Sequence, residues 1–405
     1  MTARVPQHHM AESLIGLAKI MRLAFNGDDL SEIKSQLANR IEFNSLDAAA
    51  MMDLSVVLQL NALPELALKL QTEALNLQQF FDQKSNPEAP ALKLLVIMGP
   101  GEVMANTPID FLVEGSDIAL SYLYLGEGIP VPSQIPEHDV AFVAVCESDS
   151  NQFLLAQLSI LMRHWPKPFI NMPSRIAQLS RELVSKQLAS INGVVASDAR
   201  RLSRSETMEF VSSYDNSFPI IARPINSHAG RGLAKLENGE QVFEYLEANT
   251  NDEFYVAPFI DYRSEDGLYR KSRIVVIDGQ PFAAHMAVSR NWMVHYLNAD
   301  MLHSQENRNS EAEFMSSFNT AFVTKHWAGL LAIDDQIGLD YYSIDCAETP
   351  DGRLLVFELD SGAVVHSMDS IELFPYKASQ MQLVFDAFQQ MLRRKANGVD
   401  KRMAA

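Results

Sequence analysis

Three acidic residues near the C-terminal end of the chain are the side chains best suited to chemistry. Asp345, Glu358 and Asp360 stand in runs that are otherwise apolar, with Val356 and Leu359 among their neighbours. Carboxylates in such runs are costly to bury unless something neutralises them. Mg²⁺ does this, because it binds a few carboxylates together with phosphate oxygens. The three acids therefore predict a metal site, with a solvated hairpin edge as the simpler alternative.

The segment between the acids predicts how they are brought together. Two strand-like runs flank Thr349–Gly352, whose Pro and Gly are typical of a tight turn, so a β-hairpin is expected. Pairing Thr349 with Gly352 would place Asp345 opposite Val356. Strand alternation would then put the three acids on one face of the hairpin.

A second segment predicts a phosphate-binding loop. Residues 218–224 are strand-like, and Ser227–Gly232 follow with small side chains and two glycines. Such residues let backbone N–H groups approach and cradle phosphates. Arg223, near the end of the strand, would direct its charge toward the same phosphates. The loop and the acidic hairpin together are more specific than either alone, and they indicate a nucleotide with a divalent cation.

Taken together, these motifs resemble the ATP-grasp superfamily, near its D-alanine–D-alanine ligase, glutathione synthetase and ribosomal-protein-S6-modifying branch, over about residues 92–391. The resemblance implies ATP and Mg²⁺ as cofactors, with Mn²⁺ as an alternative. It departs from the family's usual Lys at Arg223 and from its usual Asn at Asp360. It implies nucleotide contacts from Lys186, Arg223, Ser227, His228, Ala229, Gly230, Arg231 and Gly232, and from the hinge residues Tyr255, Val256 and Ala257.

The resemblance also implies which cations assist the reaction. Arg273 stands where this branch keeps an Arg facing the γ-phosphate or the developing acyl phosphate, and Arg290 is a similar candidate. A surface role is the simpler reading of either residue. Three histidines, His285, His295 and His366, are candidates for proton transfer, with a structural role as the alternative for each.

The fold class expected from the chain is α/β and α+β. Helical periodicity predicts a helical domain over residues 1–86, and alternating strands and helices over residues 91–180 predict a parallel α/β layer. The resemblance places the small lobe of an ATP-grasp fold at residues 181–254. It places the large lobe, with the metal-binding hairpin, at residues 255–396.

Two features of the first half lie outside the nucleotide motifs. Residues 47–80 resemble one tetratricopeptide-type helical pair, which would pack on the enzyme or on a second subunit of a homodimer. Gly99-Pro100-Gly101 does not match the spacing of a dinucleotide-binding fingerprint. Its loop is instead a candidate to face the acceptor substrate.

Bulk properties exclude some partners. The 405 residues carry a formal charge of −18, which argues against nucleic acid as the main partner. No segment is apolar over the length needed to span a bilayer, so no membrane is expected. Two cysteines give no disulfide framework, and a reduced cytoplasmic setting is expected.

The function expected is an ADP-forming carboxylate–amine ligase that works through an acyl phosphate on small-molecule or peptide substrates. This expectation comes from the resemblance, and the residue chemistry is consistent with it. Two alternatives remain open at this point. One is an ATP-binding regulatory or scaffold protein whose helical domain binds a partner. The other is a kinase that phosphorylates a hydroxyl.

Overall fold

The computed structural model describes residues 13–213, 218–225, 227 and 230–399. Its first part is helical, and short turns join the helices. Asp47 caps the third helix by accepting a hydrogen bond from the Ala50 amide at 2.9 Å, and Pro64 begins the fourth. The helices are α1 (Leu17–Phe25), α2 (Ser31–Phe43), α3 (Ala48–Leu60) and α4 (Pro64–Leu77).

A five-stranded sheet follows, in the order β1-β3-β2-β4-β5. Four of its strands are parallel, and β1 runs antiparallel to β3 at one edge. The strands are β1 (Phe80–Asp82), β2 (Leu92–Met98), β3 (Ile118–Tyr124), β4 (Val140–Val143) and β5 (Phe169–Ile170). The accompanying helices are η1 (Val103–Ala105), α5 (Asp110–Val113), η2 (Asp149–Asn151), α6 (Gln152–Leu161), η3 (Met162–His164) and α7 (Pro173–Ile176).

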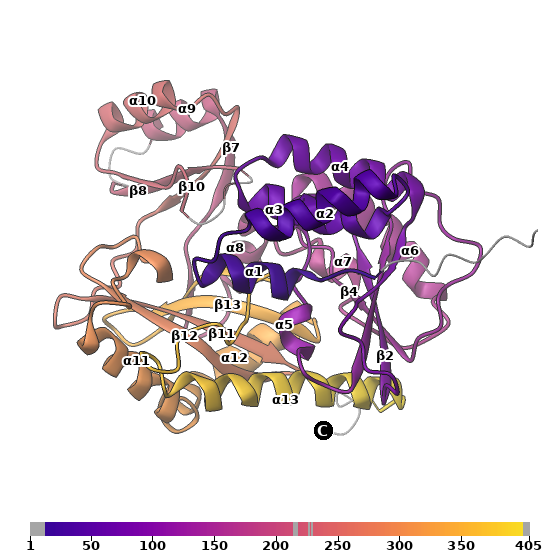
Figure 1. Ribbon diagram of the computed structural model, residues 1–405. Helices are drawn as coiled ribbons and strands as arrows, with labels where there is room; N and C mark the ends of the chain where they lie inside the picture. The colour runs from indigo at the N-terminus through magenta and orange to yellow at the C-terminus, as the bar shows by residue number, and fades with distance from the viewer. Residues whose placement is uncertain (1–12, 214–217, 226, 228–229, 400–405) are drawn as a thin grey trace, which may run out of the picture.

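The next unit is a small antiparallel sheet in the order β7-β10-β8-β9, covered by two helices. Figure 1 shows this small lobe standing apart from the rest of the molecule at the upper left. It has its own apolar core, centred on Phe254 and Val256. Its elements are β7 (Arg200–Ser203), α9 (Arg204–Ser213), β8 (Ile220–Pro224), β9 (Ala234–Leu236), α10 (Gly239–Ala248) and β10 (Glu253–Pro258).

The large lobe is built on a second five-stranded sheet, in the order β12-β11-β13-β14-β6. A two-residue turn joins β11 to β12, and its residues Asp278 and Gly279 have φ of 52° and 74°, as a type I′ turn requires. The strands are β6 (Val194–Ala196), β11 (Tyr269–Ile277), β12 (Gln280–Ser289), β13 (Tyr341–Glu348) and β14 (Leu354–Asp360). The helices are α8 (Arg181–Leu188), η4 (Tyr296–Asn298), α11 (Gln305–Ser317), the π-helix η5 (Asn319–Val323), α12 (Thr324–Ile337) and α13 (Lys377–Ala396).

One apolar core joins the helical segment, the α/β sheet and the large lobe. Met52 and Leu75 of the helices belong to it, together with β2 and β4 and with the buried face of α13. Helix α13 contacts both β4 and β11, and Figure 1 shows it running along the base of both units. The order of units is the one implied by the resemblance to the ATP-grasp superfamily. The predicted α/β and α+β fold class is therefore confirmed.

The predicted domain limits stay predictions, and two strand pairings bear on them. Strand β1 lies within residues 1–86 but pairs with β3 of the α/β sheet. Strand β6 lies within residues 181–254 but pairs in parallel with β14 of the large lobe. No helix in the described part of the chain is both long enough and apolar enough to cross a membrane.

The start of α1 is held by two buried carboxylates. Asp53 of α3 accepts hydrogen bonds from the Ile15 amide at 2.7 Å and the Gly16 amide at 3.3 Å. Asp110 of α5 accepts one from the Leu17 amide at 3.2 Å. Burial raises the pKa of Asp53 to about 7, although the two amides oppose the shift.

The raised pKa of Asp53 predicts a pH-dependent stability. A carboxyl whose pKa is higher in the folded state stabilises the fold when protonated, so its contribution is lost as pH rises from about 4 through about 7. Asp53→Asn should remove this slope and gain about 2–4 kcal/mol relative to the parent between pH 4.5 and pH 8. Urea unfolding of both proteins across this range measures the difference, and parallel pH profiles would contradict the prediction.

Candidate functional site

The acidic hairpin forms as predicted, but its register differs. Asp345 lies opposite Glu358, and Ser343 lies opposite Asp360. The three acids therefore share one face of the sheet, as expected. The predicted pairing of Asp345 with Val356 is wrong, because Cys346 occupies that position.

Two local features account for the different register. The Gly352 amide donates to the Thr349 carbonyl at 2.8 Å, and the Thr349 amide donates to the Arg353 carbonyl at 3.0 Å. Gly352 has φ of 83°, so the hairpin has a three-residue loop that ends in a left-handed glycine. A β-bulge between Asp345 and Cys346 then shifts the pairing once more.

A row of polar side chains crosses four strands on this face. His285 on β12 lies opposite Arg273 on β11, Arg273 lies opposite Asp345 on β13, and Asp345 lies opposite Glu358 on β14. Cross-strand neighbours have Cβ atoms about 5 Å apart, so these side chains interact directly. The sheet thus brings the predicted Arg273 to the predicted acids.

Two cations neutralise Asp345. Arg273 binds it with both prongs of the guanidinium, Nε to Oδ1 at 2.7 Å and Nη2 to Oδ2 at 3.1 Å. Lys271 Nζ lies 2.7 Å from Oδ2. Burial alone would raise the pKa of Asp345, but the charges of Arg273 and Lys271 outweigh it and hold the pKa well below its usual range. The same pairing raises the pKa of Arg273 against the effect of burial.

The other two acids have different surroundings. Arg181, in the first turn of α8, forms an ion pair with Glu358. Burial opposes ionisation of Glu358, but the Arg181 charge outweighs it, so the pKa is lowered. Asp360 accepts a hydrogen bond from the Gly362 amide at 2.7 Å. Burial nevertheless raises the pKa of Asp360 to about 6.

Arg223 brings a charge from the small lobe to the same region. It is half-buried on β8, and its Nε donates to Ser227 Oγ at 3.1 Å. Burial lowers the pKa of Arg223 to about 10, and repulsion from Arg181 adds to this while Glu358 opposes it. Arg223 is thus near enough to Arg181 and Glu358 for their charges to act on it.

The predicted phosphate loop is described in part. His228 and Ala229 lie outside the described residues, whereas Ser227, Gly230, Arg231 and Gly232 are described. Gly232 has φ of 68°, and a Cβ there would lie 2.7 Å from Pro224 Cδ, so the loop needs glycine at this position. A Cβ on Gly230 would lie 3.5 Å from Met293 Sδ, so the loop approaches the large lobe.

The predicted hinge residues lie on β10. Tyr255 and Val256 pair with β7 on one side and β8 on the other. The pairing with β7 ends at Val256, and beyond it Ala257 pairs with β8. Ala257 is therefore paired within the sheet on one side only, and its contact with a nucleotide stays a prediction.

Two other predicted cations are exposed. Lys186 lies on α8, and Arg290 directly follows β12, outside the cross-strand row. Of the three histidines, His285 has a buried Nδ1 without a hydrogen-bond partner, and burial lowers its pKa well below the usual value. Burial also lowers the pKa of His295, and it lowers that of His366 to about 4, so all three favour the neutral form.

The acids have the oxygen donors that Mg²⁺ prefers, but Asp345 and Glu358 are paired with protein cations, and Asp360 accepts from the Gly362 amide. Within the described residues, no group of three or more His, Cys, Asp or Glu side chains is arranged to hold a metal ion. Asp345 is 3% exposed and held by Arg273 and Lys271, so it is not available as a ligand in this arrangement. Glu358 and Asp360 are the acids that fit the role, and the metal site stays a prediction.

Sequence reasoning missed Lys271 and Arg181, the two cations that complete the ion pairs. Lys271 stands two residues before Arg273 on a strand, and this spacing alone places both on one face. Arg181 offers no such signal, because α8 and β14 are about 177 residues apart and meet only in the fold.

Comparisons with known proteins describe the fold. No family model and no curated protein matches the chain. Solved structures do match. One is a D-alanine–D-alanine ligase from Bacillus anthracis complexed with ATP, with 14% identity and a TM-score of 0.47, covering 76% of this chain and 99% of that one.

Two further solved structures are similar. An ATP-grasp RimK domain protein from Sphaerobacter thermophilus has 13% identity and a TM-score of 0.44, covering 74% of this chain and 99% of that one. The ATP-grasp ligase PsnB, complexed with its precursor peptide PsnA2 and AMPPNP, has 14% identity and a TM-score of 0.43, covering 76% of this chain and 100% of that one. These proteins belong to the superfamily whose motifs the sequence resembles.

Proposed function

We propose that the chain is an ATP-dependent, ADP-forming carboxylate–amine ligase that acts on an amino acid or a peptide. The observation that carries the proposal is the convergence of Arg273, Lys271, Arg181 and Arg223 on the acids of the hairpin. These four cations surround three carboxylates, and they could bind the phosphate oxygens of a nucleotide in place of carboxylate oxygens.

ATP would lie between the two lobes. Arg223, Lys186 and the amides of the Ser227–Gly232 loop would bind its phosphates, and the backbone of Ala257 would contact the base. Glu358 and Asp360 would hold Mg²⁺, which supplies charge neutralisation at the β- and γ-phosphates when it is bound.

The reaction would proceed in two steps. An oxygen of the substrate carboxylate attacks the γ-phosphorus and ADP leaves, which gives an acyl phosphate. Arg273 would stabilise the negative charge that develops on the transferred phosphoryl group. The nitrogen of an amine then attacks the acyl carbon, phosphate leaves with its bonding electrons, and the amine loses a proton to solvent. The products are an amide, ADP and phosphate.

Glu358→Gln tests the proposal. The variant keeps the size of the side chain but loses its charge, so amine-dependent ADP formation should fall about 100-fold. ADP and phosphate release from Mg-ATP would be measured with pooled amino acids and small peptides, and mass spectrometry would identify products. Glu348→Gln is the matched control, because Glu348 lies on the same hairpin and pairs with Lys325 and His326 instead.

The outcomes separate the candidate functions. A product lighter by one water than its two precursors, with stoichiometric ADP and phosphate, supports the ligase. A phosphorylated product without free phosphate would identify a kinase. ATP binding without turnover for any acceptor would favour a regulatory module. A folded Glu358→Gln protein with unchanged turnover would contradict the role given to the hairpin.

A further inference from the structure

Helix α1 contacts the loop that follows the three acids. This loop, residues 361–368, begins directly after β14. The helix shares one apolar cluster with the loop and with α5, and Figure 1 shows α1 beside α5 and below α3. The members of the cluster are Ala18, Met21, Phe111, Val364 and Met368. The N-terminal helices therefore reach the edge of the proposed reaction site.

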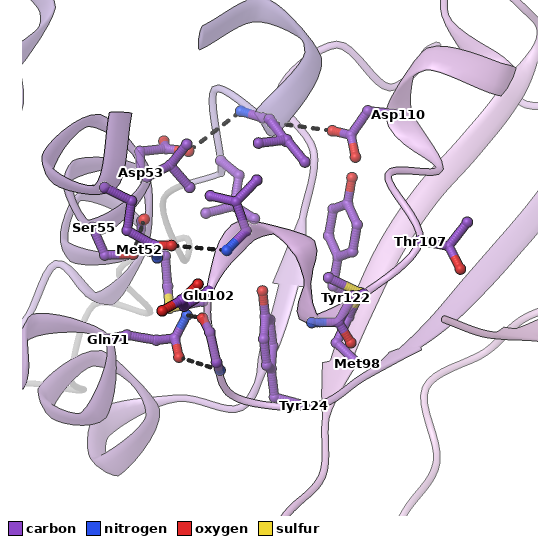
Figure 2. Close-up of a pocket in the computed structure, with 18 residues that line it drawn as sticks. Met52, Asp53, Ser55, Gln71, Met98, Glu102, Thr107, Asp110, Tyr122 and Tyr124 are labelled. Carbon is purple, nitrogen blue, oxygen red and sulfur yellow. Dashed lines mark hydrogen bonds between the residues drawn. The ribbon is translucent and has the colours of Figure 1, made fainter. Parts of the chain in front are cut away.

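The start of α1 is held on two sides. Asp53 of α3 accepts a hydrogen bond from the Gly16 amide at 3.3 Å, and Asp110 of α5 accepts one from the Leu17 amide at 3.2 Å. Figure 2 shows these two carboxylates facing the start of the helix from opposite sides. Just before the helix, the Leu14 amide donates to a carbonyl of β1 at 2.9 Å. The first turn of α1 is thus fixed to both the helices and the α/β sheet.

The other end of α1 lies against the loop. Phe25 is the last residue of the helix, and its ring lies 5.5 Å from the ring of His366. The Phe111 ring lies 6.1 Å from the same imidazole. His366 Nδ1 accepts a hydrogen bond from the Met368 amide at 3.1 Å, so a neutral ring with its proton on Nε2 fits this contact. Phe25 therefore contacts the side chain that in turn holds the backbone of the loop.

The first residues of the same loop hold Asp360. The Gly362 amide donates to Asp360 Oδ1 at 2.7 Å, and Thr107 Oγ1 donates to the Ser361 carbonyl at 2.9 Å. A Cβ on Gly362 would overlap Cys146 Sγ, so the loop packs closely against the segment after β4. A shift of the loop would therefore move an acid that the proposed site needs for Mg²⁺.

Helix α3, which holds the start of α1, is covered by the protein itself. Nine of its 13 residues are buried, among them Met51, Met52 and Val57. It packs against α1, α2 and α4. A helix that is buried on most sides belongs to a core, whereas a helical pair that binds a peptide leaves an apolar face open. The burial of α3 favours a role for these helices inside the protein.

We propose that α1 positions the loop that follows the acids, so that the N-terminal helices form part of the reaction site. Phe25 is the positioning residue, and it acts through His366. The contacts at its start keep α1 in place, Phe25 keeps the loop in place, and the loop keeps Asp360 in place. The expected effect on turnover rests on the proposed ligase function, whereas the expected effect on the loop does not.

Amide hydrogen exchange of the full-length chain tests the positioning directly. Mass spectrometry would follow the peptides that cover residues 361–368. Phe25→Ala removes the ring and should leave the helix in place, because Phe25 is its last residue and is 44% exposed. The loop should then exchange about 5-fold faster, as the loss of one aromatic contact predicts. Phe25→Tyr keeps the ring and should restore the parent rate.

Phe43→Ala is the matched control, because Phe43 is the last residue of α2 and is 95% exposed. Exchange of the loop should stay at the parent rate in this variant. Equal exchange in the parent and in Phe25→Ala would overturn the inference. An increase of the same size in Phe43→Ala would overturn it as well, because the effect would then not be specific to α1.

A double-mutant cycle tests whether Phe25 acts through His366. His366→Ala should speed exchange of the loop at least as much as Phe25→Ala does. The double variant should match His366→Ala, because the Phe25 ring has then already lost its partner. Effects that multiply in the double variant would show that Phe25 acts by another route, and they would overturn the role given to His366.

A second readout separates this inference from the proposed function. Phe25→Ala should raise the Mg²⁺ concentration needed for half-maximal ADP formation about 5-fold, and Phe25→Tyr should restore it. A purely structural role would lower the urea midpoint without this change. Faster exchange of the loop in Phe25→Ala, with no ADP formation by the parent, would keep the positioning and refute the ligase. ADP formation with an unchanged Mg²⁺ requirement in Phe25→Ala would keep the ligase and refute the link to Asp360.

Discussion

Arg273→Met should lower the rate of ADP formation about 1,000-fold and lower the free energy of unfolding by about 2–4 kcal/mol. The first effect follows from losing the guanidinium that, in the proposed mechanism, would stabilise charge on the transferred phosphoryl group. The second follows from Asp345, which is 3% exposed and would keep Lys271 but lose the two hydrogen bonds from Arg273. A coupled assay for ADP and urea unfolding measure the two effects separately.

Arg270→Met is the matched control for Arg273. Arg270 lies on the same strand, and it pairs with the more exposed Asp266 at 2.6 Å. Its loss should cost less than about 1 kcal/mol and leave turnover unchanged. Arg273→Lys should restore stability more fully than turnover, because lysine keeps the charge without the planar fork. Wild-type turnover in a folded Arg273→Met protein would remove Arg273 from the mechanism.

Glu311→Ala should destabilise the large lobe by about 3–5 kcal/mol. Glu311 on α11 is fully buried and accepts hydrogen bonds from the Met286 amide at 3.0 Å, Tyr296 at 3.0 Å and Tyr376 at 2.7 Å. Lys377 of α13 lies 3.3 Å from the same carboxylate. Removing it would leave several donors without this acceptor in a region that water does not reach.

Glu306→Ala is the matched control for Glu311, because Glu306 lies exposed on the same helix. Its replacement should change stability by less than about 0.5 kcal/mol. Equilibrium unfolding in urea, followed by the fluorescence of the three tryptophans, Trp165, Trp292 and Trp327, gives both values. A Glu311→Ala protein as stable as Glu306→Ala would show that the network around Lys377 contributes little.

Much of the fold follows from local patterns in the sequence. Local sequence alone indicates three of its elements. These are the turn at Asp278-Gly279, strand β2 with its apolar run, and helix α13 with its helical periodicity. The pairing of β6 with β14 is different, because an edge strand of three residues carries too little pattern to reveal its partner. The same holds for β1, whose pairing with β3 depends on packing rather than on its own residues.

For the candidate site, the sequence predicted the three acids and their shared face, but not all of the cations that pair with them. Alternation along two strands put Asp345, Glu358 and Asp360 on one face, and the structure agrees. The bulge beside Asp345 changes the register without changing the face, because the turn and the bulge together shift the pairing by two residues. A strand pattern does not reveal which helix delivers a counter-charge, so Arg181 was found only in the structure.

A hydrogen bond joins the two points at which the chain enters and leaves the small lobe. Ser197 Oγ, just after β6, donates a hydrogen bond to the carbonyl of Pro258, the last residue of β10, at 2.7 Å. The lobe between these points has a core of its own, and no strand of it belongs to the large sheet. The small lobe is therefore an inserted domain whose two ends lie side by side. Another domain could replace it without changing the strand connections of the large sheet, which carries the three acids.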